Sequence, residues 1–311
     1  MMSLQNNIAS EQNSARKLDQ LAAKTELYAG TEKLELLQAC LPILNAVIWP
    51  PLLAWKPGLS VWSALSGFAV PVFDAVACEP LQALWKRQAA NIQELFDCEL
   101  LGLAWNPVGI GEQPNEEEVA EYARRFRRKG GDESKLKDWY SFKFEDLPLP
   151  FARLICQRSN CWWDAKLRRY YANIIVALTS ILAVFALAIG LVAGLTLEKF
   201  ILAVVAPIAP MCLWGIREFK RQRSAAEEGD RLLRHAEAVW REGYNGKLSK
   251  PELEKASRDL QVHIYHRRRS TPVIPAWLYS LHRPEYQELM VKGGNEMIAR
   301  YRTKHDQRSQ E

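Results

Sequence analysis

Residues 172 to 195, ANIIVALTSILAVFALAIGLVAGL, contain no charged residue and no proline. A helix of this length measures about 36 Å at about 1.5 Å per residue, which is enough to cross a hydrocarbon core of about 30 Å. A buried helix of a soluble protein is the weaker interpretation, because such helices rarely stay apolar on every face for so long. The stretch therefore predicts a transmembrane helix.

The whole chain is too polar to lie entirely in lipid. Of its 311 residues, 48% are hydrophobic and 25% are charged, and the mean hydropathy is −0.22. The membrane portion must therefore be a minority, with a sizeable polar part outside it. The net charge of +5 is modest, so we expect no DNA or RNA duplex as a partner. The polar N-terminus predicts no cleavable signal peptide.

Three further stretches are candidate spans, over residues 34–55, 59–78 and 200–216. Lys56, Pro57 and Gly58 form a predicted turn between the first two, and Pro50-Pro51 should kink or end the first. A buried soluble hairpin stays open as an alternative for 34–78, because these two segments are less uniformly apolar than 172–195. The predicted architecture is an all-α membrane protein with four transmembrane helices in two hairpins, 34–78 and 172–216.

Lysine and arginine gather outside these hairpins, in an N-terminal amphipathic arm (1–33), a middle region (79–171) and a C-terminal region (217–311). The two hairpin turns hold only Lys56 and Lys199. The positive-inside rule places the three basic regions in the cytoplasm and both turns outside. An even number of spans agrees with both termini being cytoplasmic.

Helix signals recur in the predicted cytosolic regions. Residues 15–38 and 80–99 have helical apolar spacing, and the second stretch is expected to continue the span that precedes it. Asn115 is a predicted N-cap for a helix that ends before Gly130, and Ser249 with Glu252 forms a predicted capping box. The last helix is expected from about Pro284.

No catalytic motif is present, so we expect a non-enzymatic protein without cofactor. His263 and His266 are spaced to share a metal ion on a helix face, but no acid or cysteine completes the set. A solvated pair is the favoured interpretation, and no metal site is predicted.

Asp74 is the one strong acid within a predicted span. It would either line a pore or lie at the cytoplasmic boundary, where its charge costs little. The boundary is favoured, because only four residues separate Asp74 from the end of the span.

Small residues predict close helix packing in lipid at Gly190 and Gly194, preceded by Ala186, and at Ser63 and Gly67. Packing within one chain is the default interpretation, and packing between chains is the alternative. Four helices leave no lumen, so a pore would need a homo-oligomer or a large rearrangement.

Two clusters combine basic and aromatic side chains. The first contains Arg153, Arg158, Trp162, Trp163, Lys166, Arg168 and Arg169, and the second contains His266, Arg267, Arg268, Arg269, Trp277 and Tyr279. Arginine binds phosphate and aromatic faces stack on bases, so either cluster is a candidate nucleotide site. Spacing alone favours ordinary anchoring at a membrane boundary.

Four segments, taken in order, resemble the SMODS-associated four-transmembrane effectors of bacterial conflict systems. They are EQNSARKLDQLAAKTELY (11–28), FDCELLGLAWN (96–106), ICQRSNCWWDAKLRRYY (155–171) and IYHRRRSTPVIPAWLY (264–279). The resemblance implies a bacterial inner-membrane protein that acts beside a nucleotidyltransferase. A cyclic di- or oligonucleotide made during phage infection would bind the cytosolic part, and the spans would then permeabilise the membrane.

The family offers no catalytic residue to carry over. The resulting hypothesis is an effector whose Arg153–Arg169 cluster meets the nucleotide phosphates, with Trp162 or Trp163 stacking on a base. The alternative is a membrane scaffold whose cytosolic region binds a protein partner.

Overall fold

The computed structural model describes residues 6–144, 146–192, 196–200 and 206–308, and within these ranges every regular element is helical. The α-helices are α1 (Ile8–Glu11), α2 (Ala15–Trp55), α3 (Ser60–Phe73), α4 (Glu79–Leu101), α5 (Pro107–Ile110), α6 (Glu116–Arg128), α7 (Leu149–Val192), α8 (Leu197–Phe200), α9 (Ala206–Tyr244), α10 (Lys250–Ser270) and α11 (Ala276–Arg308). Two 3₁₀ turns, Pro57–Leu59 and Glu133–Leu136, and a π-helical turn, Asp74–Cys78, join them. The predicted all-α class is confirmed.

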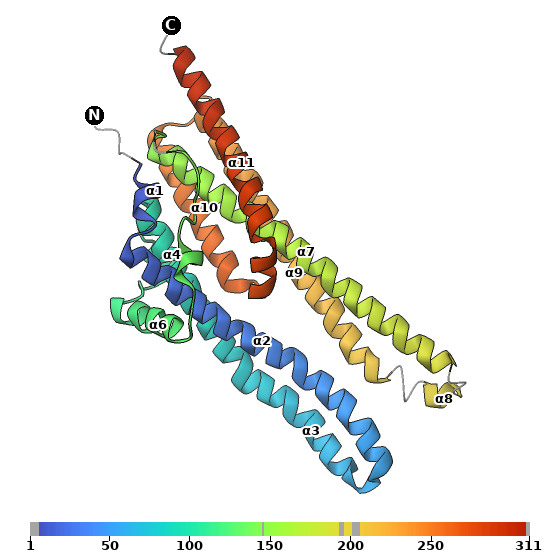
Figure 1. The fold of residues 1–311 in the computed structure, drawn as a ribbon. Helices are drawn as coiled ribbons and strands as arrows, with labels where there is room; N and C mark the ends of the chain where they lie inside the picture. The colour runs from blue at the N-terminus through green and yellow to red at the C-terminus, as the bar shows by residue number, and fades with distance from the viewer. Residues whose placement is uncertain (1–5, 145, 193–195, 201–205, 309–311) are drawn as a thin grey trace.

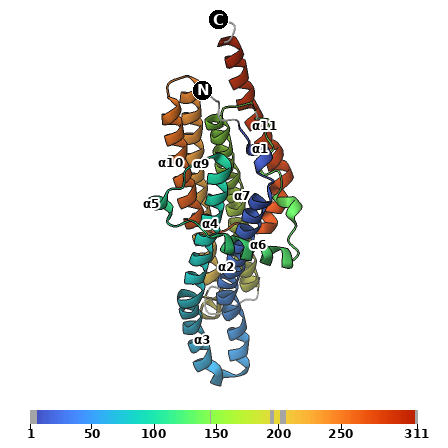
Figure 2. The same ribbon diagram turned by 90° about the vertical axis from the view of Figure 1, so that its left-hand side faces the viewer.

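Two long helical hairpins organise the molecule (Figures 1 and 2). The first pairs α2 with α3 and α4, which follow one another through the π-helical turn, and the second pairs α7 with α9. Helices α6, α10 and α11 pack around one half of these hairpins and form a helical body. The other halves extend away from the body (Figure 1).

The predicted region boundaries fall inside continuous helices. Helix α2 runs through residue 34, and α7 runs through residue 172. Pro50-Pro51 does not stop α2 at once, since the helix ends four residues later at Trp55. Helices α2 and α7 therefore each continue without a break from the helical body into an apolar extension.

Capping chemistry agrees with the sequence at two helix starts. The Asn115 side chain accepts a hydrogen bond of 2.7 Å from the backbone N–H of Glu118, and Ser249 with Glu252 forms a complete capping box. The start of the last helix was predicted too late. Helix α11 begins at Ala276, and Pro284 lies inside it.

The core of the helical body is built from the halves of the hairpins that lie nearest to it. The largest fully buried side chains come from α2, α4, the 137–148 segment, α7 and α10; they include Leu21, Ile92, Phe96, Tyr140, Phe144, Leu154, Ile155 and Tyr265. Tyr140, Phe142 and Phe144 thus anchor the irregular segment before α7 to the core.

Large apolar side chains are exposed along the distal halves of the hairpins. On the first hairpin they include Leu44, Ile48, Trp55, Val61, Trp62, Leu65, Phe68 and Val76; on the second they include Leu178, Ile181, Leu182, Val184, Phe185, Leu191, Leu213 and Ile216. Soluble monomers rarely expose contiguous apolar surface on this scale, which marks a membrane or protein contact.

Among the described residues, one helical stretch is long and apolar enough to cross a membrane, Leu149–Phe185. The predicted count of four transmembrane helices is therefore not confirmed. Part of the reason is local: α3 has 14 residues before the π-helical turn, whereas a span needs about 20.

Close packing in the second hairpin occurs at a glycine that the sequence analysis did not select. A Cβ atom on Gly215 of α9 would lie 2.3 Å from Oγ1 of Thr179 on α7. A Cβ on Gly67 would meet nothing within 4 Å among the described residues, so Gly67 makes no close contact with that part of the chain. Gly194 and the side chains of Ser63, Ala186 and Gly190 lie outside what the structure describes.

Asp74 lies in the first hairpin at the start of the π-helical turn. The Gln38 side-chain amide of α2 donates a hydrogen bond of 2.7 Å to Asp74 Oδ1. The carboxylate therefore has a polar partner across the hairpin, and neither this contact nor the fold assigns it to a pore.

Candidate ligand-binding pocket

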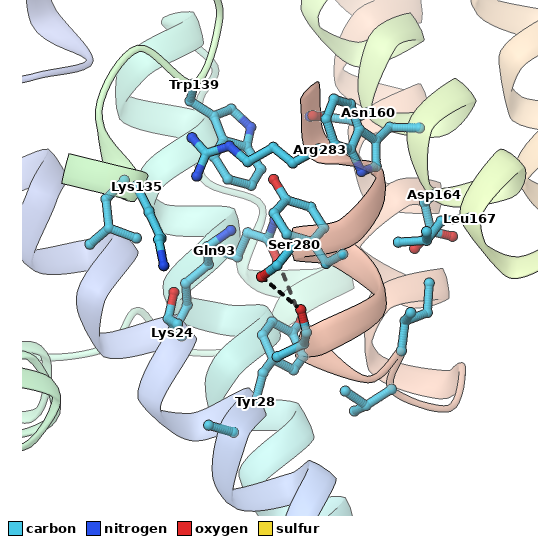
Figure 3. A pocket seen from close by; sticks show the side chains of 18 of the residues that line it. Lys24, Tyr28, Gln93, Lys135, Trp139, Asn160, Asp164, Leu167, Ser280 and Arg283 are labelled. Carbon is cyan, nitrogen blue, oxygen red and sulfur yellow. Dashed lines mark hydrogen bonds between the residues drawn. The ribbon is translucent and has the colours of Figure 1, made fainter. Parts of the chain in front are cut away.

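A pocket of about 650 Å³ lies in the helical body between the two hairpins. Its walls come from α2, α4, the segment around Glu133–Leu136, α7, α10 and the first turns of α11. Pockets of about 300–1,000 Å³ commonly hold drug-sized ligands. Figure 3 shows that residues far apart in the sequence face this space, including Lys24, Trp139, Asp164 and Arg283.

Both predicted basic clusters contribute to this one pocket. Arg168 of the first cluster and Arg267 of the second line it together. They share the Asp164 carboxylate: Arg168 Nε donates to Oδ2 at 2.6 Å, and Arg267 Nη1 donates to the same oxygen. Burial alone would raise the pKa of Asp164, but the two guanidinium groups outweigh it and hold that pKa well below its usual range.

Arg168 is fixed by further contacts. Its Nη1 donates to the side chain of Gln222 on α9 at 2.9 Å and to the backbone carbonyl of Pro272 at 2.8 Å, and Nη2 donates to Thr271 at 2.9 Å. Arg168 therefore joins both helices of the second hairpin to the segment between α10 and α11.

Arg268 is paired with Asp97 of α4. Its Nη1 donates to Asp97 Oδ2 at 2.5 Å, and both side chains are almost fully buried. Burial disfavours the charged guanidinium, but the Asp97 carboxylate outweighs it and raises the pKa of Arg268 above its ordinary value. Burying this pair is costly unless both partners are present.

Lys24 is a cation of the pocket without a carboxylate partner. Its Nζ lies 4.1 Å from the centroid of the Trp139 ring, and no hydrogen bond or ion pair to Lys24 occurs among the described residues. Burial, with a smaller contribution from Arg268, lowers its pKa to about 7. A buried ammonium group with unused donors is suited to an anionic ligand.

Other donors in the pocket wall are also unused. Arg283 of α11 makes no hydrogen bond or ion pair within the described part of the chain. The indole Nε1 of Trp163 and the Nε of Arg267 are buried without an acceptor there. Buried donors usually have partners, so these groups favour a bound acceptor-rich molecule.

Aromatic side chains form another part of the pocket lining. The rings of Trp139 and Tyr279 are nearly parallel, with centroids 6.4 Å apart. The ring centroids of Trp163 and Tyr279 are 5.5 Å apart. Burial raises the pKa of Tyr28 and of Tyr279 to about 12, so both stay neutral at physiological pH. Such faces can stack on planar rings.

Cations and aromatic side chains meet at one end of the pocket. Lys24, Lys135 and Arg283 lie around the end that contains Trp139, while Asp164 and Leu167 lie at the opposite side (Figure 3). Lys135 has an ion pair with Asp132 at 3.8 Å and is otherwise open to solvent. The Trp139 end is therefore the part of the pocket best suited to phosphate.

Several residues of the predicted clusters lie outside this pocket. Arg153 is 3% exposed and donates to the carbonyls of Leu101 and Gly102 at 2.8 and 3.0 Å, which satisfies the end of α4. Arg158 pairs with Glu237 of α9 at 3.0 Å.

Four more residues that were predicted to contact a nucleotide also lie outside the pocket. Trp162 packs edge-on against Tyr286, and Arg169 pairs with Asp230. Arg269 and Trp277 are exposed and are not part of the pocket lining. Of the predicted contacts, the pocket brings together Trp163, Arg168, Arg267 and Arg268, with Tyr279 from the second cluster.

Lys24, Trp139 and Arg283 were not selected from the sequence. One signal was present for Lys24, which lies on the same helix face as Leu21 and Leu27, where a lysine is unusual. Arg283 had no such signal, because only the packing of α11 brings it to the pocket.

Comparison with known proteins matches nearly the whole chain to one family. Residues 6–297 match the model of the "SMODS-associating 4TM effector domain". A Bacillus cereus (strain VD146) protein, named as a probable CBASS effector molecule, is 24% identical over 290 residues, covering 91% of this chain and 95% of that protein. No solved structure matches the chain.

Proposed function

Because the chain belongs to the SMODS-associating 4TM effector family, we propose that it is an antiphage effector switched on by a nucleotide second messenger. The messenger, a cyclic di- or oligonucleotide, binds the pocket of the helical body. Binding then allows the apolar halves of the two hairpins to disrupt the bacterial inner membrane. The probable CBASS effector relative supports the antiphage role.

The observation that carries this proposal is the set of unused cationic and polar donors beside aromatic rings. Lys24 and Arg283 form no ion pair or hydrogen bond in the described chain, and Trp163 has an unused indole N–H. Phosphodiesters supply anionic oxygens for the two cations. Bases supply planar faces for Trp139 and Tyr279 and acceptors for Trp163.

The position of the pocket supports coupling to the membrane. Its walls include α2 of the first hairpin and α7 of the second, on either side of the same space. A ligand held between these helices can change how the hairpins pack, because each helix continues without a break into its apolar half.

The exposed apolar side chains of the distal halves support contact with lipid. We place both termini and the helical body in the cytoplasm, following the distribution of lysine and arginine. Two hairpins leave no lumen, so the proposed lesion requires several copies of the chain or a rearrangement of its helices.

Equilibrium binding to the detergent-purified full chain tests the pocket. A panel of cyclic di- and oligonucleotides is titrated against wild type, the double variant Lys24→Met/Arg283→Met, and the control Lys166→Met. Lys166 is an exposed α7 cation outside the pocket, so the control removes a positive charge of the helical body without changing the pocket lining.

We expect one member of the panel to bind wild type and the control equally. The double variant should bind it at least tenfold more weakly, because each charge-assisted hydrogen bond contributes about 1.5–3 kcal/mol. If the double variant binds the nucleotide as tightly as wild type, the pocket is not the binding site. If wild type binds no nucleotide of the panel, the proposal that a nucleotide activates the chain is wrong.

A further inference from the structure

The chain carries no charged residue from the last residue of α10 through the first turns of α11, residues 270–281, which read STPVIPAWLYSL. Arg267, Arg268 and Arg269 precede it, and His282 and Arg283 follow it. Of the three arginines only Arg269 is exposed, because Arg267 and Arg268 are buried in ion pairs with Asp164 and Asp97. An uncharged apolar stretch beside an exposed cation is a pattern found in segments that touch a membrane surface.

The packing of α11 against α7 shows how far along the second hairpin this segment lies. The Tyr286 ring lies 5.9 Å from the Trp163 ring, and the His282 ring lies 4.2 Å from the Tyr170 ring. Moving toward the start of α11 therefore means moving along α7 toward its apolar half. The two helices are antiparallel.

The first turn of α11 lies beside the beginning of the charge-free stretch of α7. Leu278 is fully buried in a cluster that includes Ile174, two residues into the predicted span 172–195. Trp277, next to Leu278, is consequently at the level where α7 leaves the helical body.

Opposite faces of this first part of α11 have different surroundings. Tyr279 and Arg283 line the pocket. Trp277 and Leu281, four residues apart on one helix face, are 56% and 62% exposed. Leu178 of α7, four residues beyond Ile174 toward the apolar half, is also exposed.

We propose that Trp277 and Leu281 insert into the boundary between lipid headgroups and acyl chains, so that one wall of the pocket is a membrane contact. This placement rests on the proposed membrane function. Tryptophan prefers this boundary, because its ring is apolar and its N–H is polar. The occupant of the exposed face is therefore the lipid interface and not a protein partner.

Two hydrogen bonds tie the same segment to the first hairpin. The backbone N–H of Val273 donates to Glu35 of α2 at 3.1 Å, and the backbone N–H of Ala276 donates to Glu32 at 3.1 Å. The segment thus contacts the pocket, the lipid boundary and α2 at once. A ligand that shifts it would move a membrane contact directly.

Fluorescence quenching in proteoliposomes tests the depth of Trp277. The signal is the difference between wild type and Trp277→Phe, because the chain has 11 tryptophans. Two quenchers are compared: a lipid with a nitroxide near the top of its acyl chain, and iodide in the aqueous phase. Trp62→Phe gives the matched difference for an exposed tryptophan of the first hairpin.

A water-exposed control uses the same helix. Leu289→Trp in the Trp277→Phe background places the probe at a partly exposed position of α11, about 18 Å along the helix from residue 277. We expect the nitroxide lipid to quench Trp62 and Trp277, and iodide to quench the residue at position 289.

The possible results separate the two proposals. Quenching of Trp62 by the lipid, together with quenching of Trp277 by iodide alone, would overturn the inference and leave the proposed function standing. No lipid quenching of either tryptophan would overturn the membrane placement, and the inference with it.

Discussion

The Nζ atom of Lys24 lies 4.1 Å from the centre of the Trp139 ring, in a pocket where no carboxylate forms an ion pair with it. The face of an indole ring attracts a cation, but it does not neutralise the charge. An ammonium group buried in this way is less stable than in water, which explains why the pKa of Lys24 falls to about 7. A phosphate would supply the missing counter-charge.

Nucleotide affinity should consequently depend on pH through Lys24. A bound phosphate raises the pKa of Lys24 above 7, so binding takes up a proton where the free chain holds Lys24 neutral. Affinity is highest below pH 7 and falls as the pH rises through and above 7. We expect roughly tenfold weaker binding at pH 8.5 than at pH 6.5, measured by calorimetry in two buffers that differ in ionisation enthalpy.

Lys24→Met supplies the control for that pH dependence. The pKa values of Tyr28 and Tyr279 are about 12, and that of Asp164 is well below its usual range, so these pocket groups do not titrate between pH 6.5 and 8.5. The variant should bind weakly and equally at both pH values. A variant that keeps the wild-type pH profile would show that another group is responsible.

Arg158→Ala should leave nucleotide affinity unchanged, although Arg158 belongs to a sequence cluster that predicted phosphate contacts. Its guanidinium pairs with Glu237 outside the pocket. Loss of this partly exposed pair should lower the free energy of unfolding by about 1 kcal/mol or less. Titration with the nucleotide that binds wild type most tightly checks the first expectation. A tenfold loss of affinity in Arg158→Ala would show that Arg158 is part of the binding site.

Arg268→Met should be strongly destabilising, by about 3–5 kcal/mol, because it leaves the buried Asp97 carboxylate without its cation. The midpoint of thermal unfolding in detergent measures the loss. Adding Asp97→Asn removes the uncompensated charge and should restore part of the stability. If the double variant unfolds at or below the midpoint of Arg268→Met, the pair does not stabilise the fold in this way.

Two glycine substitutions should have opposite effects on the hairpins. Gly215→Ala places a methyl group against Thr179 and should separate α7 from α9, since its Cβ would lie 2.3 Å from Oγ1. Gly67→Ala meets no described atom within 4 Å and should stabilise α3 by up to about 1 kcal/mol through helix propensity.

Thermal unfolding of the two variants in the same detergent makes the comparison. Gly215→Ala should melt several degrees below wild type, and Gly67→Ala should melt at or above it. Equal midpoints for both variants would show that α7 and α9 do not pack closely at Thr179.

Local patterns in the sequence determined much of the helical architecture. The apolar runs around the Lys56–Gly58 turn and at 172–195 predicted two helical hairpins, and Asn115 and Ser249 predicted two helix starts that the structure confirms. These signals depend on neighbours within a few residues. Whether each apolar helix is a span depends also on its surroundings, and the four-span count was not confirmed.

The candidate site was only half predicted, because it is made by contacts between distant segments. The two basic clusters were treated as separate alternatives, yet Arg168 and Arg267 meet on Asp164. No spacing rule connects residues about a hundred positions apart. The same limitation explains why Arg153 was selected, although it satisfies the carbonyl end of α4.

Dye release from liposomes made of bacterial inner-membrane lipids tests the central claim most directly. The purified chain is reconstituted, and each cyclic nucleotide of the panel is added to wild type, Lys24→Met/Arg283→Met and Lys166→Met. We predict that one nucleotide releases dye with wild type and Lys166→Met, and that the double variant needs at least tenfold more of it. Absence of release with every nucleotide, from a folded and inserted wild-type chain, would contradict the account and favour a membrane scaffold.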